Sequence, residues 1–354
     1  MTKSALSQAR QKLKASAFEA LNDRLLLALE TLMPEPRWRG LRLLATDSTT
    51  LRLPPWPENQ AEFGVQTDVG GQPYVLARAL GLFSTASRRM VKAVLGRFDA
   101  AERALLVQLA PHLQQDDLLI MDRGFPALWL FAFLQQRSIP FLARLDGNAW
   151  PDVENFLRSG QAETLLTRPI TKAMRRQAQA TGVDLFDKSV VFRLVKVLLP
   201  NGQTEVLATS LTDSHAFPTQ EFADLYHAAR WGIEEAFKLL KHRLMLEQFS
   251  GELPEAIRQD FHAKVFTANL AEALATSAHE QLPEEQAARY FPNVTYILDS
   301  LKNRLFCWLI QRVPPEEVLT LLDLYARTLE RKRPGRSAPR PKSRVNPKPR
   351  RQYK

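Results

Sequence analysis

Cysteine is nearly absent from this chain of 354 residues, which contains only Cys307. A single cysteine excludes an intramolecular disulfide framework and a thiolate metal site, and it is typical of a protein from a reducing compartment. The six histidines form neither an HExxH motif nor any other paired-ligand spacing. No apolar run approaches 18 residues and no charged-then-apolar leader opens the chain, so neither membrane insertion nor export is expected.

Acidic residues are missing from residues 331–354, which hold eleven of the 48 Lys and Arg residues. The net charge of the whole chain is +10, and without this segment it is about −1. The segment is rich in proline and poor in large apolar side chains, so we predict a basic disordered tail over residues 330–354. A flexible polycation would bind duplex phosphates without sequence preference. The alternative is a terminus that only aids solubility.

The order of apolar runs and turn signals predicts an α/β protein. Residues 1–39 are expected to form amphipathic helices with a dense patch of leucines. Strands are predicted at 41–45, 74–83, 118–121, 140–145, 190–199 and 205–210, and helices at 100–113, at 127–136 and through most of 219–329. Asn201-Gly202 is typical of a tight hairpin turn, and Thr219 is a candidate N-cap.

Two aspartates are predicted at the ends of strands. Asp47 follows the apolar segment LRLLA, and Asp122 follows LLIM and precedes a Gly and a Pro. Carboxylates at the carboxyl ends of buried strands lie at the edge where open α/β sheets bind ligands. Each aspartate alone could be a turn residue or a helix cap. Asp116 and Asp117 are interpreted as residues of that ordinary kind.

The segment YHAARWGIEEAFKLLK, residues 226–241, is predicted to be an amphipathic helix. An apolar stripe at 4-3-4 spacing consists of Ile233, Phe237, Leu240 and Leu244. A charged face consists of Arg230, Glu234, Lys238 and Lys241. One carboxylate surrounded by cations is suited to binding a metal ion together with phosphates. Glu and Lys four residues apart also match an ordinary solvated ion pair.

In combination, these motifs resemble the DDE transposases of bacterial insertion sequences, in particular insertion-sequence family four with its Tyr-Arg-Glu-Lys signature. The resemblance is carried by Asp47 in LLATDSTTLRLP, Asp122 in LLIMDRGF and Glu234 in RWGIEEAFKLLK. Arg230, Glu234 and Lys241 have the spacing of the family. Tyr226 departs from it, because three residues separate it from Arg230 where the family usually has two. Only 46 residues precede Asp47, so a shortened end-recognition region is expected.

The resemblance implies an RNase H-like mixed sheet with flanking helices, interrupted by a β-rich insertion. The expected division is a helical region at 1–39, the first part of the catalytic core at 40–145, the insertion at 146–212, a helical completion of the core at 213–329 and the tail at 330–354. The implied catalytic and metal-binding residues, which would hold two Mg²⁺ or Mn²⁺ ions, are Asp47, Asp122 and Glu234. The implied DNA-binding residues are Tyr226, Arg230, Lys241, Arg123 and Lys238.

The implied activity is metal-dependent cleavage of DNA at the ends of a mobile element, followed by strand transfer into target DNA. The expected partners are terminal-repeat DNA, target DNA and a second copy of the chain on paired ends, in the cytoplasm at the nucleoid. An RNase H-like nuclease or resolvase without strand transfer and a catalytically inactive DNA-binding protein remain alternatives. Trp150 is a candidate for stacking on an exposed base, whereas Trp231 is expected in the core.

Overall fold

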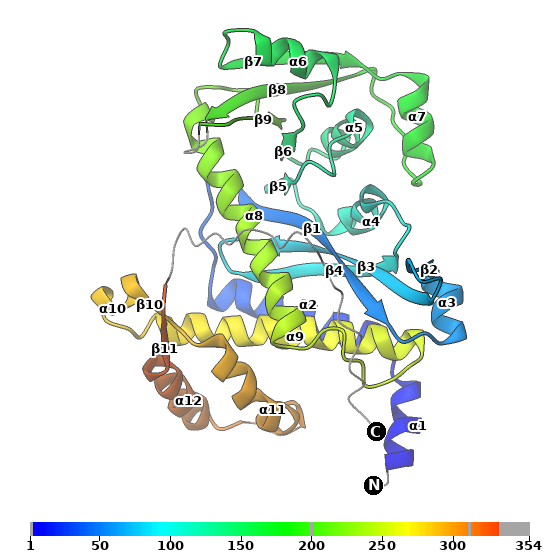
Figure 1. Ribbon diagram of the computed structural model, residues 1–354. Helices are drawn as coiled ribbons and strands as arrows, with labels where there is room; N and C mark the ends of the chain where they lie inside the picture. Colours follow the sequence, from blue (N-terminus) through cyan, green and yellow to red (C-terminus); the bar gives the residue numbers. More distant parts are fainter. Residues whose placement is uncertain (1–2, 199–201, 311–312, 333–354) are drawn as a thin grey trace.

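A computed structural model of the protein describes residues 3–198, 202–310 and 313–332. The predicted α/β class is confirmed, because a large mixed sheet lies between layers of helices (Figure 1). The proposed hairpin residue Asn201 and the basic tail beyond residue 332 lie outside the described residues. Within the described residues, no helix has both the length and the hydrophobicity needed to cross a membrane.

The main sheet has nine strands. Its strands are β1 (Arg42–Leu53), β2 (Val65–Thr67), β3 (Pro73–Ser84), β4 (Arg89–Arg97), β5 (Asp117–Met121), β6 (Phe141–Leu145), β7 (Glu163–Pro169), β8 (Ser189–Leu198) and β9 (Thr204–Thr209). Five of them, β4, β3, β1, β5 and β6, lie side by side in an RNase H-like order. Strands β1, β3 and β4 pair antiparallel, β5 pairs parallel to β1, and β6 pairs parallel to β5. Three antiparallel strands followed by two parallel ones define the RNase H-like core.

Helices cover both faces of this sheet. They are α1 (Lys3–Lys12), α2 (Ser16–Leu32), α3 (Pro57–Phe63), α4 (Glu102–Leu109), α5 (Leu128–Gln136), α6 (Pro151–Arg158), α7 (Lys172–Gln179), α8 (Thr219–His242), α9 (Pro254–His279), α10 (Glu284–Arg289), α11 (Val294–Ile310) and α12 (Pro315–Arg327). Side chains alternate between the two faces along each strand. Leu44 and Leu119 pack with α4 and α5, and Ala45 and Ile120 pack with α8 and α9.

Strand β1 is longer than predicted. The expected strand ended at residue 45, but β1 continues to Leu53 because it pairs with β3 along its whole second half. The Ser48-Thr49-Thr50 segment lies beyond the predicted end of the strand, yet its β-branched threonines favour extended backbone. Asp47 therefore lies inside a central strand, whereas Asp122 directly follows β5 as predicted.

The β-rich segment after β6 extends the core sheet instead of forming a sheet of its own. Strand β9 pairs antiparallel with β6, and β8 and β7 follow outward. Thr219, the predicted N-cap of α8, is in fact the first helical residue after Pro218. Its hydroxyl is used differently, because it donates to Glu163 on β7 and accepts from Arg193 on β8. This contact joins the start of α8 to the added strands.

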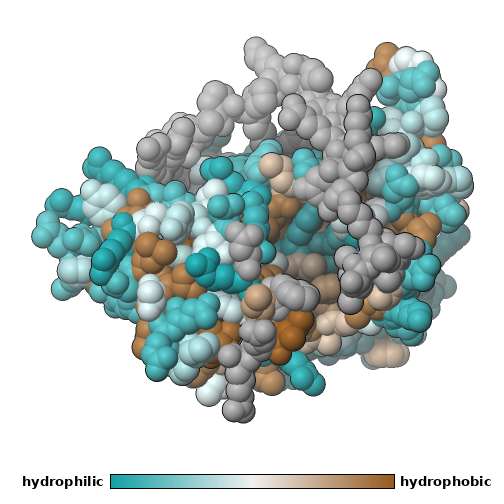
Figure 2. Space-filling model, turned by 90° about the horizontal axis from the view of Figure 1, so that it is seen from below, coloured by the Kyte–Doolittle hydropathy of each residue, from teal (hydrophilic) through white to brown (hydrophobic). Residues whose placement is uncertain are grey.

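The predicted N-terminal helices are present, and α2 packs along α9. Only part of their leucine patch is buried: Leu29 is in the core, whereas Leu27 and Leu32 are 67% and 75% exposed. Figure 2 views the molecule from below, where brown apolar areas are interspersed with hydrophilic side chains. Trp150, the candidate for base stacking, is half-buried and packs against Phe131 and Phe192 with ring centroids 6.0 Å apart, which favours a packing role.

Asp117 is not the ordinary turn residue that was expected. It is completely buried, and its carboxylate accepts two hydrogen bonds from the Arg42 guanidinium, at 2.7 and 3.0 Å. It also accepts a hydrogen bond from the backbone amide of Gln114 at 2.8 Å. This bidentate pair joins the first residues of β1 and β5. The side chain of Asp116, by contrast, forms a solvent-exposed pair with Arg37.

We expect Asp117→Ala to lower the unfolding free energy by about 3 kcal/mol, because it leaves the guanidinium of Arg42 buried without its partner. The measurement is equilibrium urea unfolding followed by circular dichroism. Asp116→Ala is the matched control and should change stability by less than about 1 kcal/mol. Equal effects of the two substitutions would contradict a structural role specific to Asp117.

Candidate active site

Two aspartates lie side by side at the centre of the sheet. Parallel pairing aligns Thr46 of β1 with Met121 of β5, so the next residues along the two strands are Asp47 and Asp122. Each aspartate follows by two positions a residue that packs on the α8 side of the sheet. Because side chains alternate along a strand, both carboxylates leave the sheet toward α8.

Helix α8 brings Glu234 to the same face of the sheet. Its buried stripe includes Ile233, Phe237 and Leu240, as predicted, and packs against β1 and β5. Glu234 directly follows the first of these residues, and its side chain is 19% exposed. At the end of the helix, Lys241 Nζ donates to the backbone carbonyl of Thr50 on β1 at 2.6 Å. This contact fixes the end of α8 against β1.

The three carboxylates interact electrostatically. Burial is the largest cause that raises the pKa of Asp47, and the carboxylates of Asp122, Glu234 and Glu102 raise it further. The hydrogen bond from the backbone amide of Ser48 acts in the opposite direction, and the resulting pKa is about 6. Like charges thus accumulate around a partly buried aspartate, which is an arrangement that a bound cation would relieve.

Tyr226 is fully buried, and its hydroxyl donates a hydrogen bond to Asp122 Oδ1 at 3.1 Å. Burial and the adjacent carboxylate raise the pKa of Tyr226, so it stays a donor. The predicted direct contact of Tyr226 with DNA is not available in this conformation. Arg230 pairs with Glu234 one turn along the helix. Tyr226 and Arg230 therefore hold one carboxylate each.

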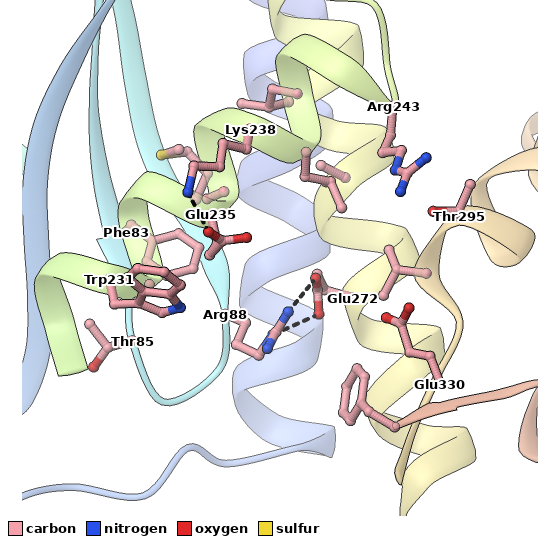
Figure 3. Close-up of a pocket in the computed structure, with 18 of the residues that line it drawn as sticks. Phe83, Thr85, Arg88, Trp231, Glu235, Lys238, Arg243, Glu272, Thr295 and Glu330 are labelled. Carbon is pink, nitrogen blue, oxygen red and sulfur yellow. Dashed lines mark hydrogen bonds and ion pairs between the residues drawn. The ribbon is translucent and has the colours of Figure 1, made fainter. Parts of the chain in front are cut away.

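Lys238 does not face Glu234. Its ammonium pairs with Glu235 at 2.6 Å and lies 4.9 Å from the ring centre of Trp231. The expected core position of Trp231 is wrong, since this side chain is 44% exposed. Both residues line a pocket of about 1030 Å³ between α8, α9 and the β10–β11 ribbon (Tyr290–Pro292 with Leu329–Arg331). Figure 3 shows this pocket with the ion pair between the exposed Arg88 and the buried Glu272.

Carboxylate oxygens are the ligands that Mg²⁺ and Mn²⁺ prefer, so Asp47, Asp122 and Glu234 fit such an ion chemically. In the described parts of the chain, no three His, Cys, Asp or Glu side chains already form a metal-binding cluster. The contacts explain this arrangement, because Asp122 is bonded to Tyr226 and Glu234 to Arg230. The elevated pKa of Asp47 is the observation that favours a cation here.

Three further residues contact this site, and the motif analysis did not identify them. Ser48 Oγ donates a hydrogen bond to Glu102 in the first turn of α4, and Arg103 binds the loop after Asp122. Arg123, a predicted DNA-binding residue, is 59% exposed and lies 3.5 Å from Asp146. The sequence offered one signal for Glu102, an acidic residue at the start of a predicted helix, and that signal is also typical of helices without any site.

An RNase H-like sheet with aspartates on adjacent central strands and a glutamate on the covering helix defines a class of three-carboxylate proteins. Residues 38–270 match the profile of the transposase DDE domain, and the chain belongs to this family. The resemblance found in the sequence is thereby confirmed.

Two known proteins give a measure of the similarity. Transposase InsG for insertion sequence element IS4, from Escherichia coli (strain K12), is 27% identical over 295 residues, which are 82% of this chain and 64% of InsG. The chain thus spans less than two thirds of the length of this relative. A piggyBac transposase synaptic complex with hairpin DNA, determined by cryo-EM, has a TM-score of 0.40 and 10% identity over 84% of this chain and 59% of that chain. That likeness is too low to support an argument.

Asp47→Asn is expected to stabilise the metal-free protein increasingly as the pH rises. The pKa of Asp47 is about 6 in the folded protein against an ordinary value of 3.8. Between these two pH values the folded state therefore binds more protons than the unfolded state. The unfolding free energy of the wild type therefore falls as pH rises from about 4 to about 6, by about 2 kcal/mol from this group.

The measurement is thermal unfolding in EDTA from about pH 4 to pH 7.5. The advantage of Asp47→Asn should be smallest at the acidic end and complete at the neutral end. Asp224→Asn, the same change at an exposed position of α8, should show no such trend. A pH-independent difference between Asp47→Asn and the wild type would contradict the raised pKa.

Proposed function

We propose that this protein is a DNA transposase that cleaves the ends of a mobile element and joins them to target DNA. Family membership supports the proposal, together with one observation on the site. Asp47, Asp122 and Glu234 come from separate segments, yet they lie close enough that the carboxylates of Asp122 and Glu234 add to the effect of burial in raising the pKa of Asp47. Terminal-repeat DNA, target DNA and a second copy of the chain are the proposed partners, in the bacterial cytoplasm.

Mg²⁺ or Mn²⁺ is the proposed cofactor, held by Asp47, Asp122 and Glu234. When bound, two such ions supply activation of the attacking oxygen and charge stabilisation of the leaving oxygen. The protein contributes orientation: the amide of Ser48 holds Asp47, and the hydroxyl of Tyr226 holds Asp122. Carboxylates oriented in this way would hold the cations with little reorganisation on binding.

Arg230, Lys241 and Arg123 are the proposed contacts to DNA phosphates. Arg123 is next to Asp122, and its exposed pair with Asp146 is weak enough to exchange for a phosphate. Arg230 would exchange Glu234 for a phosphate when Glu234 holds a cation. Tyr226 is proposed to position Asp122 instead of binding DNA. Lys238 lies on the pocket side of α8, so we do not place it at the cleavage site.

Glu234→Gln is expected to abolish strand transfer while DNA binding persists, since it removes a carboxylate and leaves the helix intact. Wild-type protein, flanking DNA of the element and a target plasmid are incubated with Mg²⁺ or Mn²⁺, and joined products are counted. The expected loss is on the order of 100-fold or more, the scale of removing one electrostatic group from an active site. Asp122→Asn should behave in the same way.

Glu235→Gln is the matched control, because its carboxylate is adjacent in sequence but faces the pocket and pairs with Lys238. It should retain strand transfer. Full activity of Glu234→Gln would overturn the assignment of the site. Cleavage without joined products in the wild type would indicate an RNase H-like nuclease, and binding without any metal-dependent product would indicate a DNA-binding protein.

Arg230→Ala is expected to lower the salt dependence of DNA binding. Each lost phosphate contact reduces the slope of log K against log salt by about 0.9. The measurement is fluorescence anisotropy of a labelled element end at four salt concentrations. Lys238→Ala removes a cation from the other side of α8 and should leave the slope unchanged. The reverse result would place DNA on the pocket side of the helix.

A further inference from the structure

The two aspartates form the same type of local hydrogen bond. Asp47 Oδ1 accepts a hydrogen bond from the amide of Ser48 at 2.7 Å, and Asp122 Oδ1 accepts one from the amide of Arg123 at 2.7 Å. The backbone amide of the following residue thus helps to orient each carboxylate, in addition to the Tyr226 hydroxyl at Asp122. Contacts that restrict the backbone of Ser48 and of the loop after Asp122 therefore also restrict the orientation of the two carboxylates. In both cases the fixing contact comes from the first turn of α4.

Glu102 fixes the segment after Asp47. Its carboxylate accepts a hydrogen bond from the Ser48 hydroxyl and lies 3.4 Å from Arg78 Nη1 on β3. Ser48 leaves β1 on the α4 side of the sheet, opposite to Asp47, as the alternation along the strand requires. Glu102 therefore holds β1 from the face opposite to the candidate active site. Its other oxygen lies near the second loop, since a Cβ added at Gly124 would be 3.1 Å from Glu102 Oε2.

Arg103 fixes the segment after Asp122. Its guanidinium donates to the carbonyl oxygens of Phe125 at 2.7 Å, Gly124 at 3.1 Å and Pro126 at 3.1 Å. Three successive carbonyl acceptors for one guanidinium leave the loop little freedom, because the donors have a fixed planar geometry. The first of these carbonyls belongs to Gly124, two residues after Asp122, and Asp122 directly follows β5.

We propose that Glu102 and Arg103 are positioning residues of the three-carboxylate site, which set the orientation of Asp47 and Asp122 for metal binding. This inference rests on the proposed function, since it assumes that these aspartates bind a metal. Packing of α4 does not require either side chain, because the helix is anchored in the core by Leu105, Leu106 and Leu109. An acidic residue in a first turn also interacts favourably with the helix dipole, and that effect depends on its charge.

The proposal is tested by the affinity of the full chain for Mn²⁺ without DNA. Thermal unfolding is followed against Mn²⁺ concentration, and free Mn²⁺ is measured independently by electron paramagnetic resonance. Ser48→Ala, Glu102→Ala and Arg103→Ala should each weaken Mn²⁺ binding by about 10-fold or more, as expected for groups that orient metal ligands. Glu102→Gln keeps an acceptor for the Ser48 hydroxyl and should stay within about threefold of the wild type.

Two controls separate positioning from general destabilisation. Glu58→Ala removes an exposed acidic residue from the first turn of α3 and should bind Mn²⁺ like the wild type. The double variant of Ser48→Ala with Glu102→Ala should be no weaker than the weaker single variant, because both changes break one contact. Unfolding temperatures in EDTA identify any variant that fails to fold, and Glu102→Gln then still tests the hydrogen bond.

Asp47→Asn distinguishes failure of the inference from failure of the proposed function. If Asp47→Asn binds Mn²⁺ like the wild type, the three-carboxylate site itself is wrong. If Asp47→Asn loses binding but Ser48→Ala, Glu102→Ala and Arg103→Ala retain it, only the positioning role is overturned. If Glu102→Gln is as weak as Glu102→Ala, the charge of Glu102 matters instead of its hydrogen bond, and positioning through Ser48 is overturned.

Discussion

The parallel pairing of β1 with β5 is the constraint on which the candidate active site depends. In this register Thr46 pairs with Met121, so Asp47 and Asp122, the residues that follow, lie next to each other on one face of the sheet. A shift of one residue in either strand would turn one carboxylate to the opposite face. The ion pair of Arg42 with the buried Asp117 joins the first residues of the two strands. It therefore stabilises the same register at the end of the strands that is farther from the two aspartates.

Bringing carboxylates together in this way is unfavourable without a cation, and the surrounding structure supplies compensating contacts from both faces of the sheet. On one face, Tyr226 and Arg230 of α8 hold Asp122 and Glu234. Gly81, which pairs with Asp47, leaves space for the side chain of Met90 on β4, because a Cβ there would lie 2.5 Å from the Met90 sulfur. On the other face, α4 binds the segments that follow the two aspartates.

Much of the core could be predicted from the sequence, because apolar runs and turn residues report burial directly. The strand that precedes Asp122 and the apolar stripe of α8 are examples. Features that depend on distant partners could not be predicted. The second half of β1 begins with the polar run Ser48-Thr49-Thr50, and its extension to Leu53 is seen in the pairing with β3. Arg42 and Asp117 are 75 residues apart, and nothing local in either segment indicates a buried ion pair. The DNA-binding roles remain predictions.

The unusual spacing of Tyr226 has a geometric consequence on α8. Each residue of an α-helix rotates by about 100°, so a tyrosine three positions before Arg230 would occupy the place of His227, which is 40% exposed. Four positions before it, the tyrosine joins the stripe of Ala229 and Ile233 and is buried. Its hydroxyl then reaches Asp122 from inside the protein. One residue of spacing thus determines whether this tyrosine takes the partly exposed position of His227, beside Glu205, or supports the carboxylate that lies beneath the helix.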